Sequence, residues 1–152
     1  MKLDYKIRLM KGKDIPEAMK IANQNWTGEC EWIQKSVFAK VLKDNPKTCW
    51  VMEIDRKIAG VRLVCDDFEH RAWGWLLIMR PEFRRNGFGT KLWQETNKSL
   101  KNKGYRCLLG DCGLNDISSI KWHKKMGFKI LCKIPGWFFD NSTGILFYYK
   151  LK

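Results

Sequence analysis

A basic, glycine-containing turn is the stretch of this sequence best suited to binding a ligand. The turn, Arg84–Gly89 (RRNGFG), follows an uncharged apolar run. Gly87 and Gly89 allow an anion to approach the main chain closely, and a helix N-terminus after the turn would present unpaired backbone N–H groups. Arg84 and Arg85 add positive charge. The turn is therefore suited to a pyrophosphate.

The residues on either side predict the elements that position this turn. Residues Ala72–Met79 (AWGWLLIM) carry no charge and no polar alternation, which indicates a central strand covered on both faces. Pro81 ends that strand because proline cannot donate to a β-ladder. A stripe spaced four residues apart from Phe88 to Leu100 predicts an amphipathic helix.

The turn matches neither a dinucleotide fingerprint, since Leu92 stands at the third glycine position, nor a Walker loop. The alternative is an ordinary basic turn without a ligand. The position of the turn between a buried strand and a helix favours an anion-binding site over this alternative.

Met79-Arg80-Pro81, the turn and the following helix resemble the acyl-CoA-binding motif of the GNAT superfamily of N-acyltransferases. The resemblance implies an α/β (α+β) fold, with a mixed, mostly antiparallel seven-stranded sheet flanked by about four helices. It implies that the sheet splays between its fourth and fifth strands, here Ala72–Met79 and Tyr105–Gly110. Acetyl-CoA would lie in that gap as co-substrate.

The resemblance also assigns the contacts of this co-substrate. Backbone groups of Ile78 and Met79 would pair with the pantetheine arm and the thioester oxygen, where one fixed N–H donor is typically worth about 3 kcal/mol to the transition state. The residues that would wrap the pyrophosphate are Arg84, Arg85, Asn86, Gly87, Phe88, Gly89 and Thr90.

A second stretch, Ser119–Phe128 (SIKWHKKMGF), also resembles the family. Counting back from its final Gly-Phe, His123 falls where many members carry the tyrosine that protonates the departing CoA thiolate. Phosphinothricin-type acetyltransferases have a similar Ser-Ile-x-Leu-His pattern. With a free pKa near 6.5, His123 is the general-acid candidate. The alternatives are a solvated helical histidine and one that touches only a phosphate.

Ser119 and one residue before this helix complete the expected cofactor contacts. Residue type favours Asn115 and spacing favours Asp116, and we choose Asn115. The alternative for both is a helix N-cap, although a cap can also be a ligand.

No general base is evident. An amine with a pKa near 10.4 must lose a proton before attack, which at pH 7 costs about 4.6 kcal/mol unless the site assists. Four acids could serve through a water, and each is otherwise a solvated loop acid: Asp66, Asp67, Glu69 and Asp111.

Acceptor selection in the family falls to the first helix–helix connection and the last hairpin loop, here Asn25–Trp32 and Pro135–Asp140. Both are aromatic, and Glu29 and Glu31 could hold a cationic amine. The expected acceptor-binding residues are Trp26, Glu29, Trp32, Trp73, Trp75 and Trp137. The alternative is that the aromatic residues pack the core, since a chain with eight tryptophans must bury most of them.

The remaining elements follow from periodicity and turn residues. A capping box at Asp14–Glu17 begins the first helix, and Gly104 ends the helix that follows the turn. The other expected strands and helices are Tyr5–Leu9, 33–42, Thr48–Ile54, Ile58–Cys65, Asp116–Met126, Phe128–Ile134 and Gly144–Leu151.

Composition bounds the class of protein. The 152 residues suffice for a single domain, and no apolar run reaches the length of about 18 needed to span a bilayer. The charged N-terminal stretch is no secretory signal, so we expect a cytoplasmic protein. Six dispersed cysteines without metal-ligand spacing predict buried thiols and no metal site.

The net charge is +13, and residues 80–133 hold 13 Lys and Arg against 4 Asp and Glu. This segment could bind nucleic acid, or it could collect the phosphates of coenzyme A. The second explanation needs no further assumption, so we do not expect nucleic acid as a partner. We predict a monomer or homodimer that moves an acetyl group from acetyl-CoA directly to a small amine or peptide amine. The alternative is a non-catalytic basic module that senses acyl-CoA or binds RNA or ribosomes.

Overall fold

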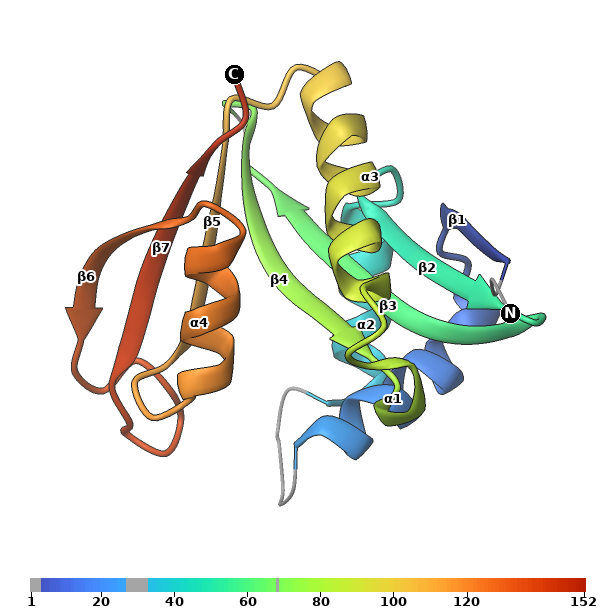
Figure 1. Ribbon diagram of the computed structural model, residues 1–152, viewed down its shortest axis with the longest axis horizontal. Coiled ribbons are helices and arrows are strands. Elements are labelled where there is room, and N and C mark those ends of the chain that lie inside the picture. Colours follow the sequence, from blue (N-terminus) through green and yellow to red (C-terminus); the bar gives the residue numbers. More distant parts are fainter. Residues whose placement is uncertain (1–3, 27–32, 68) are drawn as a thin grey trace.

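The computed structural model describes residues 4–26, 33–67 and 69–152, which form a seven-stranded sheet with helices on both faces (Figure 1). The elements in chain order are β1 (Tyr5–Leu9), α1 (Ile15–Asn25), α2 (Lys35–Asp44), β2 (Cys49–Ile54), β3 (Lys57–Asp66), β4 (Arg71–Met79), α3 (Phe88–Asn102), β5 (Cys107–Gly113), α4 (Ile117–Lys125), β6 (Lys129–Ile134) and β7 (Gly144–Lys150). Short 3-10 turns at Gly12–Asp14 and Pro81–Phe83 precede α1 and follow β4.

The sheet has the strand order β1-β2-β3-β4-β5-β7-β6, and its neighbours are antiparallel except β4 and β5. These two strands are parallel and pair only from Arg71 with Cys107 to Trp73 with Leu109. Beyond this short ladder they separate, and Figure 1 shows them diverging toward the end of the sheet where α3 and α4 begin. The expected fold and the expected splay are confirmed.

Two hydrophobic cores lie on opposite faces of the sheet. In Figure 1, α3 and α4 cover one face, and α1 and α2 cover the other. Phe88, Leu92 and Leu100 of α3 are buried in the first core, as the four-residue spacing predicted. Ile21 of α1 and Phe38 of α2 are buried in the second. None of the helices in the described ranges is both long and apolar enough to cross a membrane.

The predicted capping box at the start of α1 is wrong, because the Asp14 side chain makes no cap hydrogen bond. Asp14 is buried, and its carboxylate accepts hydrogen bonds from Arg8 at 2.7 and 3.0 Å and from the Lys11 N–H at 2.7 Å. Burial alone would raise the pKa of Asp14, but these hydrogen bonds outweigh it and hold the pKa below its ordinary value. A buried carboxylate needs a cation, and Arg8 on β1 supplies it.

The fifth strand runs from Cys107 to Gly113, so the predicted range Tyr105–Gly110 begins too early. Tyr105 is buried, but its N–H donates to Leu100 O at 3.1 Å and so belongs to the end of α3. Gly104 has a φ of 92°, as expected of a residue that ends a helix in the left-handed region. An apolar residue at this position resembles the start of a strand, but the burial of Tyr105 comes from packing after the helix end.

Coverage of β4 on both faces is only partly confirmed. Ala72, Leu76, Ile78 and Met79 are buried, whereas Trp73–Trp75 are half-buried where the sheet opens. The β3–β4 register also shifts here: Val64 pairs with Gly74 and Leu63 with Leu76, which leaves Trp75 as the extra residue of a β-bulge.

Arg62 is a fully buried charge that joins the sheet to α3. It is 2% exposed, and burial lowers its pKa to about 9, so it stays charged at neutral pH. Its guanidinium donates to Trp93 O at 2.9 Å, to Thr96 Oγ1 at 2.6 Å and to Asn97 Oδ1 at 2.6 Å. Three neutral acceptors on one helix therefore take the place of a carboxylate.

Replacing Arg62 with Ala should lower the free energy of unfolding by about 3 kcal/mol, because it removes three hydrogen bonds and leaves buried acceptors on α3 without donors. Urea denaturation measures this. Lys57→Ala, at an exposed position of the same strand, is the matched control and should change the free energy by less than about 0.5 kcal/mol. Equal effects of the two substitutions would contradict a special role for Arg62.

Candidate functional site

The edge of β4 that faces the opening presents backbone groups that have no strand partner among the described residues. The Arg80 N–H donates to Ala59 O of β3 at 2.8 Å. Backbone groups alternate in direction along an antiparallel ladder, so those of Ile78 also face β3, whereas those of Leu77 and Met79 face the opening. Of the two residues expected to pair with an acyl-CoA arm, Met79 has its N–H directed to the opening, and Ile78 does not.

The turn before α3 has the conformation of an anion site. Gly87 is the N-cap of α3 with a φ of 77°, in the left-handed region that glycine adopts without strain. It offers no side chain to cap the helix, and no side chain in the described part of the chain accepts from the first N–H groups of α3. Gly89 permits close packing, since a Cβ there would lie 3.4 Å from Met79 Cγ. The N-terminus of α3 thus lies directly beside the end of β4.

The side chains of this turn differ in what they contact. Arg85 and Asn86 are exposed. Arg84 donates from Nε to Met79 O at 3.1 Å and from Nη2 to Asn25 Oδ1, so its guanidinium contacts protein oxygens. Phe88 is buried against Tyr5 and Phe83, at ring-centroid distances of 6.1 and 6.5 Å, and can offer a ligand only its backbone. Gly89 and Thr90 are half-buried in the first turn of the helix.

The start of α4 lies at the same end of the sheet (Figure 1). Asp116 is its N-cap and accepts hydrogen bonds from the Ser119 N–H at 2.9 Å and from Ser118 Oγ at 3.0 Å. The capping role that the sequence left open between Asn115 and Asp116 therefore belongs to Asp116. Asn115 is exposed beside it.

His123 packs between α4 and the sheet. Its ring stacks on Phe147 of β7, with centroids 4.3 Å apart and planes at 8°, and meets the edge of Phe128 at 5.0 Å. A Cβ on Gly110 of β5 would lie 3.6 Å from Nε2, so the glycine leaves room at that nitrogen. The interpretation of His123 as a solvated helical histidine is therefore wrong.

The hydrogen bonds of His123 fix its tautomer. Nδ1 lies 2.8 Å from Ser119 O and 3.3 Å from Ser119 Oγ. A carbonyl only accepts, so Nδ1 is assigned the proton and, in the neutral ring, Nε2 carries the lone pair. Burial lowers the pKa of His123, although the Ser119 hydrogen bond and the Asp111 charge oppose it. The neutral form therefore dominates at pH 7.

Aromatic side chains connect the two halves of the sheet on the α3 and α4 face. Trp93 of α3 contacts Trp122 of α4 at 6.3 Å, Tyr149 of β7 at 5.1 Å and Phe128 at 6.3 Å. The contacts with Trp122 and Tyr149 are edge-to-face, and such pairs contribute about 0.5–1.5 kcal/mol each beyond the area they bury. These contacts hold the halves together where backbone pairing is short.

A carboxylate and two tryptophans meet on the opposite face. Asp111 of β5 accepts a hydrogen bond from Trp137 Nε1 at 2.5 Å, and the Trp137 ring lies 6.1 Å from that of Trp73 on β4. Burial raises the pKa of Asp111 above its ordinary value, although the Trp137 hydrogen bond and the His123 charge oppose the shift. This cluster brings β4, β5 and the β6–β7 loop together next to the last β4–β5 pair.

The other three candidate bases lie elsewhere. Asp66 and Asp67 stand where β3 ends, and Glu69 follows them in the connection to β4, at the paired end of β4 and β5. Asp67 pairs with Arg71 at 2.5 Å, and Glu69 lies 3.6 Å from Arg71 and 3.8 Å from Arg106. Of the four acids, Asp111 is the one beside the opening.

The predicted acceptor residues divide between surface and core. Trp26 and Trp137 are 37% and 39% exposed, whereas Trp75 is half-buried and packs against Phe38 at 5.6 Å. Core packing accounts for Trp50 and Trp93, which are 5% and 7% exposed. The predictions for Glu29, Glu31 and Trp32 fall on residues outside those that the structure describes.

Cysteine and metal predictions can be compared with the described part of the chain. The five cysteines within the described ranges are free. Cys49 and Cys112 are buried as expected, but Cys132 is exposed because it lies on the edge strand β6. Across residues 4–26, 33–67 and 69–152, no three His, Cys, Asp or Glu side chains are grouped to hold a metal ion.

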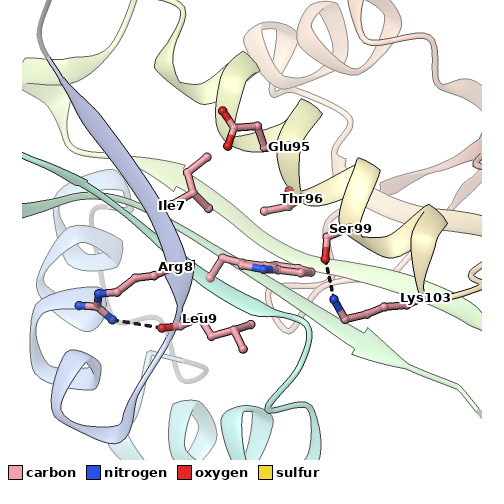
Figure 2. Close-up of a pocket in the computed structure, with 8 residues that line it drawn as sticks. Ile7, Arg8, Leu9, Glu95, Thr96, Ser99 and Lys103 are labelled. Carbon is pink, nitrogen blue, oxygen red and sulfur yellow. Dashed lines mark hydrogen bonds between the residues drawn. The ribbon is translucent and has the colours of Figure 1, made fainter.

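A surface hollow between β1 and the later turns of α3 lies away from the opening (Figure 2). Its polar side chains have protein partners: Glu95 accepts from Tyr5 at 2.7 Å, and Lys103 contacts Ser99 at 2.6 Å. The hollow is lined by Ile7, Arg8, Leu9, Trp50, Glu95, Thr96, Ser99 and Lys103. It contains none of the predicted site residues.

Two features of the site were not recognised from the sequence. One is the β-bulge at Trp75, whose signal was the isolated Gly74 inside an apolar strand. A Cβ on Gly74 would lie 3.4 Å from Leu109 O, so this glycine permits the close approach of β5. The other is the contact of Asp111 with Trp137, which has no signal in the sequence because it depends on where the last loop folds.

The chain matches a known protein family, and its fold is similar to those of several solved structures. Residues 15–128 match the model of the acetyltransferase (GNAT) family. Ard1 from Thermoplasma volcanium has a TM-score of 0.88 at 19% identity, covering 96% of this chain and 97% of that one. The ribosomal-protein-S18-alanine N-acetyltransferase from Escherichia coli has a TM-score of 0.84 at 15% identity, covering 98% and 95%.

A third structure, the PaiA N-acetyltransferase from Thermoplasma acidophilum in complex with coenzyme A, has a TM-score of 0.81 at 16% identity, covering 97% of this chain and 99% of that one. At such low identity the structures establish a shared fold, while the family match rests on the sequence.

The free energy of unfolding should fall as the pH drops below about 6.5. In the unfolded chain His123 binds a proton near its ordinary pKa, whereas burial lowers the pKa of His123 in the folded chain. A proton bound only by the unfolded chain makes the free energy of unfolding change by up to about 1.4 kcal/mol per pH unit. His123→Phe should remove this component while keeping the ring stack. Urea denaturation at about pH 5.5, 6.5 and 7.5 measures it.

The control for this measurement is His70→Asn, because His70 is the other histidine of the chain and is exposed. It should keep the wild-type slope. An unchanged slope in His123→Phe would show that His123 does not resist protonation.

Proposed function

From the premise that the chain belongs to the acetyltransferase (GNAT) family, we propose that it moves an acetyl group from acetyl-CoA directly to a primary amine. The observation that carries the proposal is the anion-binding turn at the N-terminus of α3, placed beside the end of β4 that faces the opening. Together they offer a site for the pyrophosphate and, a short distance away, a backbone donor for the thioester.

The cofactor contacts follow from this placement. The first N–H groups of α3 bind the pyrophosphate, and exposed Arg85 and Asn86 add charge and a polar side chain. Exposed Asn115 at the start of α4, with Ser119 in its first turn, contacts the cofactor from the other half of the sheet. The relative crystallised with coenzyme A supports this co-substrate.

The reaction needs an acceptor for the amine proton, and we assign this role to Asp111, which the Trp137 hydrogen bond holds beside the opening. The deprotonated nitrogen attacks the thioester carbon, and the Met79 N–H donates to the developing oxyanion, a contact typically worth about 3 kcal/mol. The tetrahedral intermediate collapses as the C–S bond breaks, giving the amide and the CoA thiolate. Asp111 takes one proton from the ammonium group before the attack, directly or through one water, and the second proton leaves the nitrogen to solvent water as the intermediate collapses.

His123 is the proposed acid for the thiolate. Because Nδ1–H donates to Ser119 O, the proton delivered to sulfur must come from Nε2. The lowered pKa makes the imidazolium a strong acid but a minor species at pH 7. Acid catalysis by His123 therefore decreases as the pH rises above neutral.

The acceptor side favours a cationic amine. Asp111 supplies negative charge, and the indole rings of Trp73 and Trp137 supply faces that attract a cation. A small primary amine and a peptide amine both present an ammonium group of this kind.

Calorimetric titration at physiological salt tests the cofactor site. Acetyl-CoA and desulfo-CoA should bind with micromolar affinity, and ATP should bind much more weakly. Arg85→Glu combined with Gly87→Trp should abolish that binding and turnover, because the pair reverses a charge and forces a bulky residue into a left-handed backbone. Undiminished turnover in this double variant, or equal binding of ATP by the wild type, would overturn the proposal.

Asp111→Asn should lower turnover about a hundredfold or more, because the amide cannot accept a proton from the amine. It keeps an oxygen to accept from Trp137 Nε1. Since burial raises the pKa of Asp111, its ionisation as the pH rises costs folding stability, and the neutral amide should melt at a higher temperature at pH 8.

Thiol release with a panel of amines and thermal melting measure the two effects. Glu69→Gln, at an exposed position, is the control and should leave turnover unchanged. Full turnover in Asp111→Asn would exclude Asp111 as the base.

A further inference from the structure

Three arginines flank the short turn between β4 and α3, and they have different contacts. Arg80 comes before Pro81–Phe83, and Arg84 and Arg85 follow it. Arg80 is largely buried; it pairs with Glu17 in the first turn of α1 and donates from Nε to Ile58 O at 2.5 Å. Arg85 has no hydrogen-bond or ion-pair partner within the described ranges.

Arg84 contacts the other end of α1. Its Nη2 donates to Oδ1 of Asn25, the last residue of that helix, and its Nε donates to Met79 O at 3.1 Å. The Asn25 amide donates in turn to Ile21 O at 2.7 Å and lies 3.5 Å from Met79 O. One arginine thus joins the end of α1 to the end of β4.

We propose that Arg84 is a positioning residue and not a phosphate ligand. This inference rests on the proposed function. The guanidinium edge formed by Nε and Nη2 contacts two protein oxygens, so that edge is occupied before any anion arrives. Arg85, next in sequence and without a side-chain partner among the residues that the structure describes, is the arginine left to bind phosphate.

The contacts of Arg84 with Asn25 and Met79 position the amine acceptor relative to the acetyl-CoA thioester. Asn25 is followed by Trp26, an exposed residue proposed to contact the acceptor, and Met79 carries the N–H proposed to hold the oxyanion. Arg80 and Arg84 attach α1 at its two ends, so together they fix how the helix lies against the end of β4. Displacement by about 1 Å of groups that position a substrate can lower a rate a hundredfold.

The first arm of the experiment separates positioning from phosphate binding. Desulfo-CoA is titrated calorimetrically against Arg84→Ala and Arg85→Ala at about 50 and 200 mM salt. Arg85→Ala should weaken binding about tenfold and flatten its salt dependence, because a phosphate contact is lost. Arg84→Ala should change the affinity by less than about twofold and keep the wild-type salt dependence.

The second arm measures the acceptor side. The amine that the wild type acetylates fastest among tyramine, spermidine and a Ser-Gly-Gly peptide serves as the probe. Arg84→Ala and Asn25→Ala should each raise the KM for that amine about tenfold, and the double variant should be no worse than either single variant. Arg84→Lys should not restore the KM, since one ammonium group cannot replace the paired Nε and Nη2 donors.

Hydrogen exchange of α1 provides a readout that requires no substrate. Arg84→Ala and Asn25→Ala should speed exchange in residues 20–26 to the same degree, and Arg85→Ala should leave it at the wild-type rate. The proposal is overturned if Arg84→Ala weakens desulfo-CoA binding as Arg85→Ala does, or if it changes neither KM nor exchange. If the wild type binds no desulfo-CoA, the proposed function fails, and the exchange arm alone decides whether Arg84 holds α1.

Discussion

The structure depends on the short length of the parallel ladder between β4 and β5. A parallel ladder of three residue pairs joins the two halves of the sheet, and each backbone group of β4 beyond Trp73 that faces β5 has no strand partner among the described residues. Such groups carry a free-energy cost unless water or a ligand satisfies them. The opening therefore converts part of a buried strand into a row of donors and acceptors for an extended molecule, and the helices that begin beside it add unpaired N–H groups.

Contacts between side chains hold the two halves of the sheet together where the backbone ladder is short. On one face Trp93 contacts aromatic residues from the other half of the sheet, and on the opposite face Trp137 reaches Trp73 and Asp111. Large rings can span the distance between strands that have separated, and Trp73, Trp93, Trp122 and Trp137 do so here. The same contacts explain why a carboxylate is half-buried at the opening, where burial raises its pKa and makes it a better proton acceptor for an amine.

Several of the positively charged side chains have structural roles that differ from one another. Arg8 holds buried Asp14, Arg62 joins β3 to α3 without a carboxylate, and Arg80 and Arg84 contact the two ends of α1. These arginines contact protein atoms. Arg80 and Arg84 belong to the basic segment 80–133, so part of the charge of that segment is used within the fold. A planar guanidinium with several donors can satisfy carbonyl, hydroxyl and amide oxygens from two elements at once, which a lysine cannot.

The sequence by itself determined the order of the elements, the turn that precedes α3 and the side of α3 that is buried, because these depend on local periodicity, glycine and proline. The family resemblance supplied the splay, which no local pattern encodes. Tertiary structure alone decided which of four acids lies at the opening, that Asp116 caps α4, that Asp14 contacts Arg8, and where Arg84 directs its guanidinium. Each of these depends on residues distant in the chain, such as Trp137 for Asp111 and Asn25 for Arg84, which meet only when the sheet has formed.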